Sequence, residues 1–283
     1  MNIKRVIVYI ATMLISTLGF AQAQINTKKV KIGDFTQKIT KVVLTGNMFY
    51  DSTLEDEIIA RWKISPYEFC TLEEFEELKG NDEYYFLLTI KGQFKKESEP
   101  GLQFLTLVKG GEKAEKGISS MLEVVSLPFA SADAPSGRET VFFPAFIDII
   151  QEYTLKSIDR DLHAYSGLSN YSLALPKTKD MTVVFSEDDL STEITKDIIE
   201  TYFVEGMIIT DESKADQYLT DYESNSAVSY VVAPTTAKVG SYCYKMLFDN
   251  QSHTLYYFRK HKISNGVGVG FLAEDIKRIA SHR

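Results

Sequence analysis

The chain has 283 residues, of which 44% are hydrophobic and 25% charged. This composition is typical of a packed globular protein, not of a disordered or fibrous one. The formal net charge is −8, and removing Lys4 and Arg5 with an N-terminal leader gives −8 − 2 = −10. An acidic balance of this kind argues against general binding to nucleic acid or anionic lipid.

The N-terminus has the three parts of a secretory signal peptide. MNIKR is a short basic region, VIVYIATMLISTLGF is an apolar run, and Ala21–Ala23 is a small-residue cleavage motif. We therefore expect a signal peptide over residues 1–23 and an exported chain, periplasmic or secreted, that begins at Gln24. An uncleaved anchor is the alternative. No cysteine lies near the cleavage site to accept a lipid, and no later stretch approaches membrane-spanning length, so we expect no membrane insertion after cleavage.

The first half of the mature chain predicts eight elements, beginning with a β-branched strand at Lys38–Gly46. Ser52 or Thr53 would cap the helix that follows, because acidic residues stand three positions after each of them. The further elements, in chain order, are a strand at Ile64–Cys70, a helix at 71–80 capped by Thr71, strands within 81–92, 102–111 and 119–128, and a long helix within 141–158.

The second half predicts the same eight elements in the same order. They are a strand at 181–187, a helix at 194–203, a strand at 207–212, a helix at 214–222, strands within 226–234, 241–249 and 253–263, and a closing helix at 271–280. The last two strands would form a hairpin around DNQS, Asp249–Ser252.

The apolar pattern also recurs at a nearly constant offset. The stripe Leu54, Ile58, Ile59 and Trp62 returns at Ile194, Ile198, Ile199 and Tyr202, and 194 − 54 is 140. Two later pairs, Phe86 with Tyr230 and Leu105 with Leu247, have offsets of 144 and 142. We therefore predict an α/β (α+β) protein of two tandem lobes, 30–178 and 179–283, that duplicate a β-α-β-α-β-β-β-α unit of mixed sheets with helices packed on them.

Four segments carry a resemblance to known envelope proteins: MIITDE (207–212), SAVSYVVAP (226–234), YKMLFDNQSHTLYYFR (244–259) and AEDIKRIA (273–280). In element order the unit resembles the N-terminal domain of the Tol–Pal protein TolB and the periplasmic domains of the LpoB and CsgG type. The chain also looks like exported Gram-negative proteins of unknown function. The resemblance implies a role in binding or assembly, and it assigns no residue a role. The chain departs from these families because it lacks both a lipid-attachment cysteine and a β-propeller repeat.

The two cysteines, Cys70 and Cys243, are 173 residues apart and so do not occupy equivalent positions in the two repeats. In an exported protein a disulfide between them would tie one half to the other. Two buried thiols that pack as small apolar groups are the alternative.

Residues that would carry out catalysis are sparse. His163, His253, His261 and His282 lie far apart, without metal-ligand spacing, and we expect them on the surface. There is no G-x-S-x-G elbow, and the three glycines in Asn265–Ile276 do not form a phosphate-binding motif. We therefore expect no catalytic residue, no metal and no cofactor.

Two segments offer candidate binding residues. The irregular stretch Pro128–Pro144 presents Arg138, Phe142 and Phe143, and a linker without function is its alternative. The run YYFRKHKI presents Arg259, Lys260 and Lys262. These cations are typical of an edge strand that discourages pairing, and the alternative is a patch for an acidic partner or an anionic glycan.

The leading hypothesis is a non-catalytic envelope protein that binds an unidentified protein partner through a sheet edge or the cleft between the lobes. The alternative is a binding protein or enzyme that acts on a glycan or small molecule in that cleft. A pocket with convergent polar groups would favour the second hypothesis.

Overall fold

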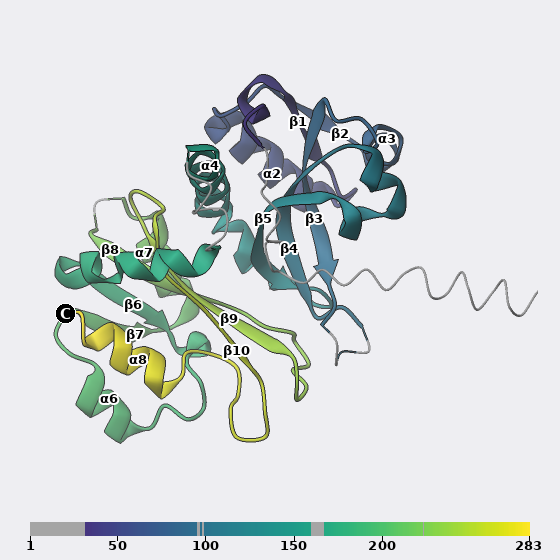
Figure 1. Cartoon of the computed structure of the whole chain (residues 1–283). Helices are drawn as coiled ribbons and strands as arrows, with labels where there is room; N and C mark the ends of the chain where they lie inside the picture. Colours follow the sequence, from purple (N-terminus) through teal and green to yellow (C-terminus); the bar gives the residue numbers. More distant parts are fainter. Residues whose placement is uncertain (1–31, 95–96, 98, 160–166, 223) are drawn as a thin grey trace, which may run out of the picture.

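The computed structural model describes residues 32–94, 97, 99–159, 167–222 and 224–283, so the predicted signal peptide lies outside the described residues. Figure 1 shows two lobes side by side, each built on one mixed five-stranded sheet with helices packed against it. In the part of the chain that the structure describes, no helix combines the length and the apolar character needed to cross a bilayer.

The described residues of the first lobe form five strands, three α-helices and several short 3-10 turns. In chain order these are η1 (Phe35–Gln37), β1 (Ile39–Val43), α2 (Met48–Arg61), β2 (Tyr67–Cys70), α3 (Leu72–Leu78), β3 (Tyr84–Gly92), β4 (Leu102–Lys109), η2 (Glu112–Lys116), η3 (Ile118–Ser120), β5 (Leu122–Ser131), η4 (Arg138–Thr140) and α4 (Phe143–Asp159).

The second lobe repeats this series after a long 3-10 segment. In chain order it contains η5 (Leu168–Asp180), β6 (Thr182–Ser186), η6 (Glu187–Asp189), α6 (Lys196–Tyr202), β7 (Met207–Thr210), α7 (Glu212–Thr220), β8 (Ser226–Val232), β9 (Tyr242–Asp249), β10 (Leu255–Lys262) and α8 (Ala273–Ala280).

The two sheets have the same topology, which confirms the predicted duplicated α/β fold. The first has the strand order β2-β1-β3-β4-β5, and the second, read from its other end, has the order β7-β6-β8-β9-β10. In each sheet the first strand of the lobe runs parallel to both neighbours, and the last three strands are antiparallel. Each strand therefore has a counterpart at the same place in the other lobe.

Helix α3 forms as its capping residues predict, whereas α2 begins earlier than expected. Thr71 accepts a hydrogen bond from the backbone N–H of Glu74, and the Glu74 carboxylate accepts one from the N–H of Thr71. Helix α2 instead starts at Met48, because the side chain of Asn47 accepts the hydrogen bond of the Tyr50 N–H.

The predicted apolar stripe is only partly buried. Leu54, Ile58 and Trp62 enter the core, but Ile59 is 63% exposed, so its assignment to the buried stripe was wrong. Adjacent helical positions point about 100° apart, and Ile59 therefore faces solvent when Ile58 faces the sheet. In the second lobe α6 starts after Ile194, at the cap Thr195, and its apolar side chains are only half-buried.

The lobes share one continuous core, because α4 packs on both sheets. Helices α2 and α4 cover one face of the first sheet, and α6 and α8 cover the equivalent face of the second. The opposite face of the second sheet is covered partly by α7 and partly by aromatic residues at the start of α4. Phe142 meets Tyr230 with ring centroids 4.2 Å apart, and Phe146 meets Phe248 at 5.6 Å. Figure 1 shows α4 between the two lobes.

Candidate functional site

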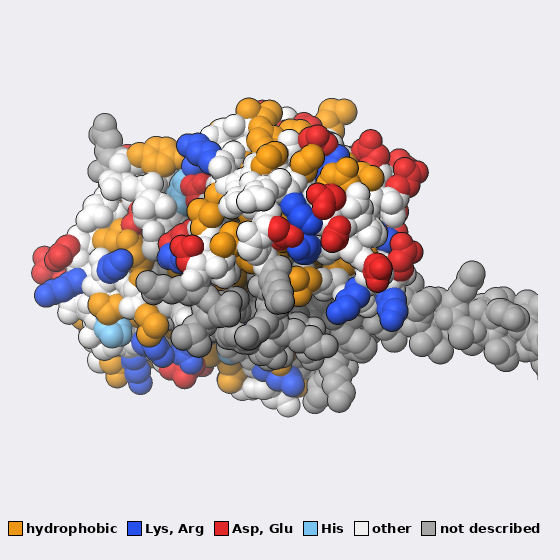
Figure 2. Space-filling model, turned by 45° about the horizontal axis from the view of Figure 1, so that its top comes forward, with side chains coloured by type: hydrophobic (Ala, Val, Ile, Leu, Met, Phe, Trp, Pro, Cys, Tyr) orange, Lys and Arg blue, Asp and Glu red, His pale blue; other side chains and the backbone are white. Residues whose placement is uncertain are grey.

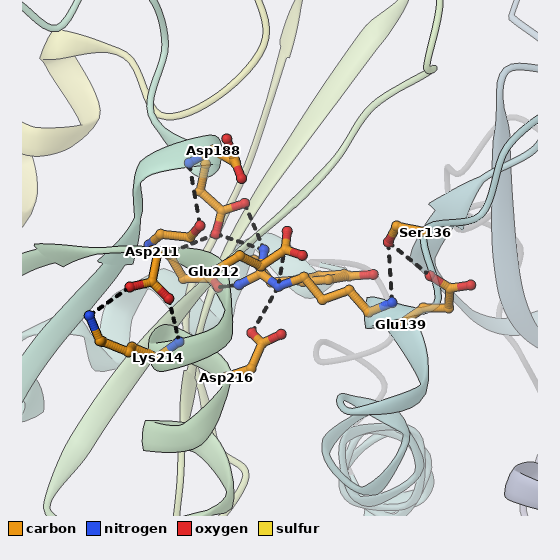
Figure 3. Close-up of polar contacts among 12 residues, drawn as sticks. Ser136, Glu139, Asp188, Asp211, Glu212, Lys214 and Asp216 are labelled. Carbon is orange, nitrogen blue, oxygen red and sulfur yellow. Dashed lines mark hydrogen bonds and ion pairs between the residues drawn. The ribbon is translucent and has the colours of Figure 1, made fainter.

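The most highly charged buried cluster joins the two lobes through Arg138. Its guanidinium donates Nη1 to both carboxylate oxygens of Asp189, at 3.0 and 3.1 Å, and Nε to Oδ1 of Asp216 at 2.8 Å. Nη2 donates to the backbone oxygen of Ser229 at 3.1 Å. Figure 3 shows Ser136 and Glu139 of the first lobe on one side of this cluster and Asp188, Glu212 and Asp216 of the second lobe on the other.

The charges in this cluster do not balance, because one guanidinium contacts two carboxylates, of which Asp189 is buried and Asp216 is half-buried. Burial opposes the charged form of Arg138, but Asp189 and Asp216 outweigh it and raise the pKa of the guanidinium. Burial also raises the pKa of both Asp189 and Asp216, with Arg138 acting in the opposite direction. The guanidinium stacks on the rings of Phe142 and Tyr230, each 5.3 Å away.

The candidate binding residues of the segment before α4 are therefore core residues. Phe142 and Phe143 are fully buried, and Arg138 is 7% exposed. Phe143 packs within the first lobe against Tyr50, with ring centroids 5.0 Å apart. The expectation that these three side chains form an exposed partner-binding surface is corrected, because all three are buried: Arg138 and Phe142 contact the second lobe, and Phe143 packs within the first.

The basic run lies on β10, which is an edge strand of the second sheet. Successive side chains on a strand point to opposite faces, so the three cations have different surroundings. Arg259 donates to Asp275 at 3.3 Å and pairs with Glu274 at 3.5 Å. Lys260 lies over the rings of Tyr242 and Tyr244, at 5.3 and 6.0 Å from their centroids.

Lys260 has no ion pair among the residues that the structure describes. Its side chain is exposed overall, yet the surrounding atoms desolvate the ammonium group enough to lower its pKa. Lys262, two residues further along the same face, is exposed. Arg259 is thus a structural cation, whereas Lys260 and Lys262 remain available to an anion.

The free edge of β10 is covered along only part of its length. Ser172 of η5 accepts a hydrogen bond from the Phe258 N–H at 3.0 Å and donates one to the Phe258 carbonyl at 3.1 Å. In an antiparallel strand alternate residues direct their backbone groups to the same side. The backbone N–H and carbonyl groups of Lys260 and Lys262 therefore point away from β9, as those of Phe258 do. Within the described chain these outward groups make no backbone hydrogen bond.

His253 is a buried residue that the sequence interpretation placed on the surface. It is 4% exposed, and its Nδ1 lies 2.6 Å from Oδ2 of Asp148 on α4. Beside this contact is a hollow of about 460 Å³ lined by Ala60, Arg61, Lys63, Asp148 and Gln151. The hydrogen-bond partner of the His253 side chain, Asp148, lies in the other lobe, 105 positions away in the chain, so no local sequence signal identifies this contact. His163 lies outside the described residues.

Both cysteines are free and buried, so the disulfide alternative is not formed in this structure. Cys70 ends β2 of the first lobe, and Cys243 lies in β9 of the second. Burial raises the pKa of each thiol to about 11. Each is therefore protonated at neutral pH and packs as a small apolar group.

The burial of the Glu123 carboxyl group on β5 leads us to expect that stability falls as the pH rises. Burial raises its pKa to about 7, against a smaller opposing effect of a hydrogen bond with Ser126. A carboxyl whose pKa is higher in the folded than in the unfolded state stabilises most below pH 4.5, and this contribution is lost as the pH rises through 7. We expect about 2 kcal/mol of stability to be lost between pH 5 and 8 after allowing for solvent screening.

Urea unfolding of the wild type and of Glu123→Gln at pH 5, 6, 7 and 8 measures this effect. The glutamine variant should show a decline smaller by about 2 kcal/mol, because its side chain cannot ionise at this position. Equal slopes in the two proteins would contradict the assignment.

The described residues contain no group of three His, Cys, Asp or Glu side chains placed to hold a metal ion. No protein-family model, curated protein or solved structure matches this chain.

Proposed function

We propose that this protein is a non-catalytic, exported binding protein that takes an extended acidic segment of a protein partner along the uncovered part of β10. The observation that supports this most is Lys260, a partly desolvated cation without a carboxylate partner at a strand edge whose outward backbone groups are free. Adding a strand to such an edge satisfies the backbone groups of both chains.

The spacing and sign of the charges favour an acidic occupant. Lys260 and Lys262 project from one face of the strand two residues apart, or about 6.8 Å. An added strand that carries carboxylates at alternate positions would match them. Figure 2 shows acidic side chains gathered on the first lobe, which carries the glutamate-rich helix α3. A negatively charged segment is therefore repelled there and directed toward β10.

Crosslinking in the native host tests the proposal. Tagged mature protein is crosslinked, and mass spectrometry identifies the joined peptides. We expect pairs that link Lys260 or Lys262 to an acidic segment of an envelope protein, and capture that falls at least about tenfold in Lys260→Glu/Lys262→Glu. The matched control is Lys113→Glu/Lys116→Glu, two exposed lysines of η2 that undergo the same change in charge.

A backbone variant separates strand addition from simple charge attraction. Lys260→Pro removes an N–H that points away from β9, so it blocks an added strand while the pairing within the sheet remains. Loss of capture in this variant supports strand addition. Unchanged capture in the β10 charge variant, or an equal loss in the η2 control, would sink the proposal.

The alternative is a glycan or small-molecule site, and it rests on a hollow of the first lobe rather than on a cleft between the lobes. Aromatic side chains fill the interface around Phe142 and Tyr230, but the hollow beside His253 is lined by polar groups. This hollow is a second candidate binding site, independent of the edge of β10.

A further inference from the structure

The hollow of about 460 Å³ lies where the end of α2 meets α4. Arg61 is the last residue of α2, Lys63 follows two positions later, and Asp148 and Gln151 lie one helical turn apart on α4. His253, between β9 and β10 of the second lobe, contacts the lining residue Asp148 at 2.6 Å. Two chain segments of the first lobe therefore line one small polar hollow, and a third segment contacts its lining.

The acidic groups at this hollow are already bound. Glu57 accepts the Nε–H of Arg61 at 2.6 Å, and Asp148 Oδ2 accepts Nη1 at 3.1 Å as well as the contact from His253. Oε1 of Gln151 accepts the backbone N–H of Lys63 at 2.8 Å. Each of these three acceptor groups therefore already has a donor partner within the protein.

The donors at the same place remain largely free. Nη2 of Arg61 and the ammonium of Lys63 have no partner among the described residues, and Lys63 is exposed. The amide nitrogen of Gln151 makes only a long contact of 3.5 Å with Asp148. An excess of N–H donors over free acceptors, with two cations among them, favours an oxyanion.

His253 adds an imidazole next to these donors, and its backbone has a left-handed conformation that is energetically unfavourable. Among the described residues it is the single non-glycine with positive φ, at 55°. A left-handed residue with a side chain costs about 1–2 kcal/mol, and such strain is concentrated at functional sites. Asp148 binds Nδ1 and leaves Nε2 without a hydrogen-bond partner in the described chain. When Nδ1 carries the proton, Nε2 accepts a hydrogen bond, for example from a hydroxyl group.

We propose that this hollow binds a small hydroxylated oxyanion, namely an acidic sugar or a sugar phosphate. Its carboxylate or phosphate group contacts Arg61 and Lys63, and a neighbouring hydroxyl donates to Nε2 of His253. The site is separate from β10 and does not depend on partner binding there.

The single tryptophan of the chain provides the measurement, because Trp62 lies between Arg61 and Lys63 in the sequence. Its fluorescence is followed while mature protein is titrated with glucuronate, glucose 6-phosphate, glucose or inorganic phosphate. We expect saturable binding of glucuronate or glucose 6-phosphate, and the tighter of the two identifies carboxylate or phosphate as the anion. Glucose and inorganic phosphate should bind at least about tenfold more weakly, since each lacks one of the two contacts.

Variants assign the contacts. Lys63→Gln should weaken binding of the sugar anion about tenfold, and Lys113→Gln, an exposed lysine elsewhere, should leave it unchanged. His253→Asn keeps a residue that tolerates the left-handed backbone and should weaken the sugar anions without affecting inorganic phosphate. The proposal is overturned if none of the four probes binds, if glucose binds as tightly as glucuronate, if inorganic phosphate binds as tightly as both sugar anions, or if Lys63→Gln has no effect.

Discussion

Replacing Arg138 with methionine should lower the free energy of unfolding by about 3–5 kcal/mol. Methionine fills much of the same volume, but Asp189 and Asp216 of the second lobe would then lie together at the interface with no cation from the first lobe between them. Burial already raises the pKa of both carboxyl groups in the wild type, so neither tolerates the loss of the guanidinium. Equilibrium urea unfolding followed by circular dichroism measures the change.

A charge-neutral variant is the control for this experiment. Arg138→Met/Asp189→Asn/Asp216→Asn removes all three charges together and should recover a large part of the loss, because no uncompensated carboxylate remains. Arg138→Lys should recover little, since one ammonium cannot reproduce the fork that reaches both carboxylates. A loss below about 1 kcal/mol for Arg138→Met would show that the ion cluster does not hold the lobes together.

Changing Asp275 to asparagine should lower the free energy of unfolding by a comparable amount. The ion pair that this change breaks lies entirely within the second lobe. The Asp275 carboxylate accepts hydrogen bonds from Lys245, from the Tyr257 hydroxyl at 2.6 Å and from the Leu272 N–H at 2.8 Å. Lys245 is 1% exposed and has no other partner among the described residues. Asparagine keeps the shape and an acceptor oxygen but leaves a buried ammonium without a counter-charge, which costs about 3–5 kcal/mol.

The double variant Lys245→Met/Asp275→Asn tests this explanation. It removes the buried cation together with the carboxylate, and we expect it to be more stable than Asp275→Asn alone. Lys245→Met alone should cost less than Asp275→Asn, because Arg259 still donates to Asp275 at 3.3 Å. A double variant no more stable than the single one would rule out an uncompensated charge as the cause.

The architecture could be predicted because it follows from local signals that repeat. The apolar strands, the cap at Thr71 and the hairpin around Asp249–Ser252 each depend on residues close in the sequence. The start of α2 was predicted wrongly because several cap residues compete there. Asn47 precedes Ser52 and Thr53, and the hydroxyl of Thr53 bonds back to the Phe49 carbonyl inside the helix.

The surroundings of the candidate site residues could not be predicted in the same way. Arg138 finds its carboxylate partners 51 and 78 positions later, in the other lobe. A charged residue in an irregular segment is usually solvated, and only the packing of the lobes reverses that expectation. For the run of cations on β10, the sequence predicted the edge position, but the different roles of Arg259 and Lys260 depend on which face each side chain takes.

The first lobe packs on the second through a head-to-tail contact between two similar units. One unit presents its long closing helix to the α7 side of the next sheet, and such head-to-tail contacts can propagate into filaments. The first unit carries η2 and η3 between β4 and β5, and Ala114 and Met121 occupy the face that a preceding copy would need. The last unit closes with α8, which has 8 residues where α4 has 17. The outer faces of the two described units thus differ from the faces that join them, as the terminal units of short repeat arrays often do.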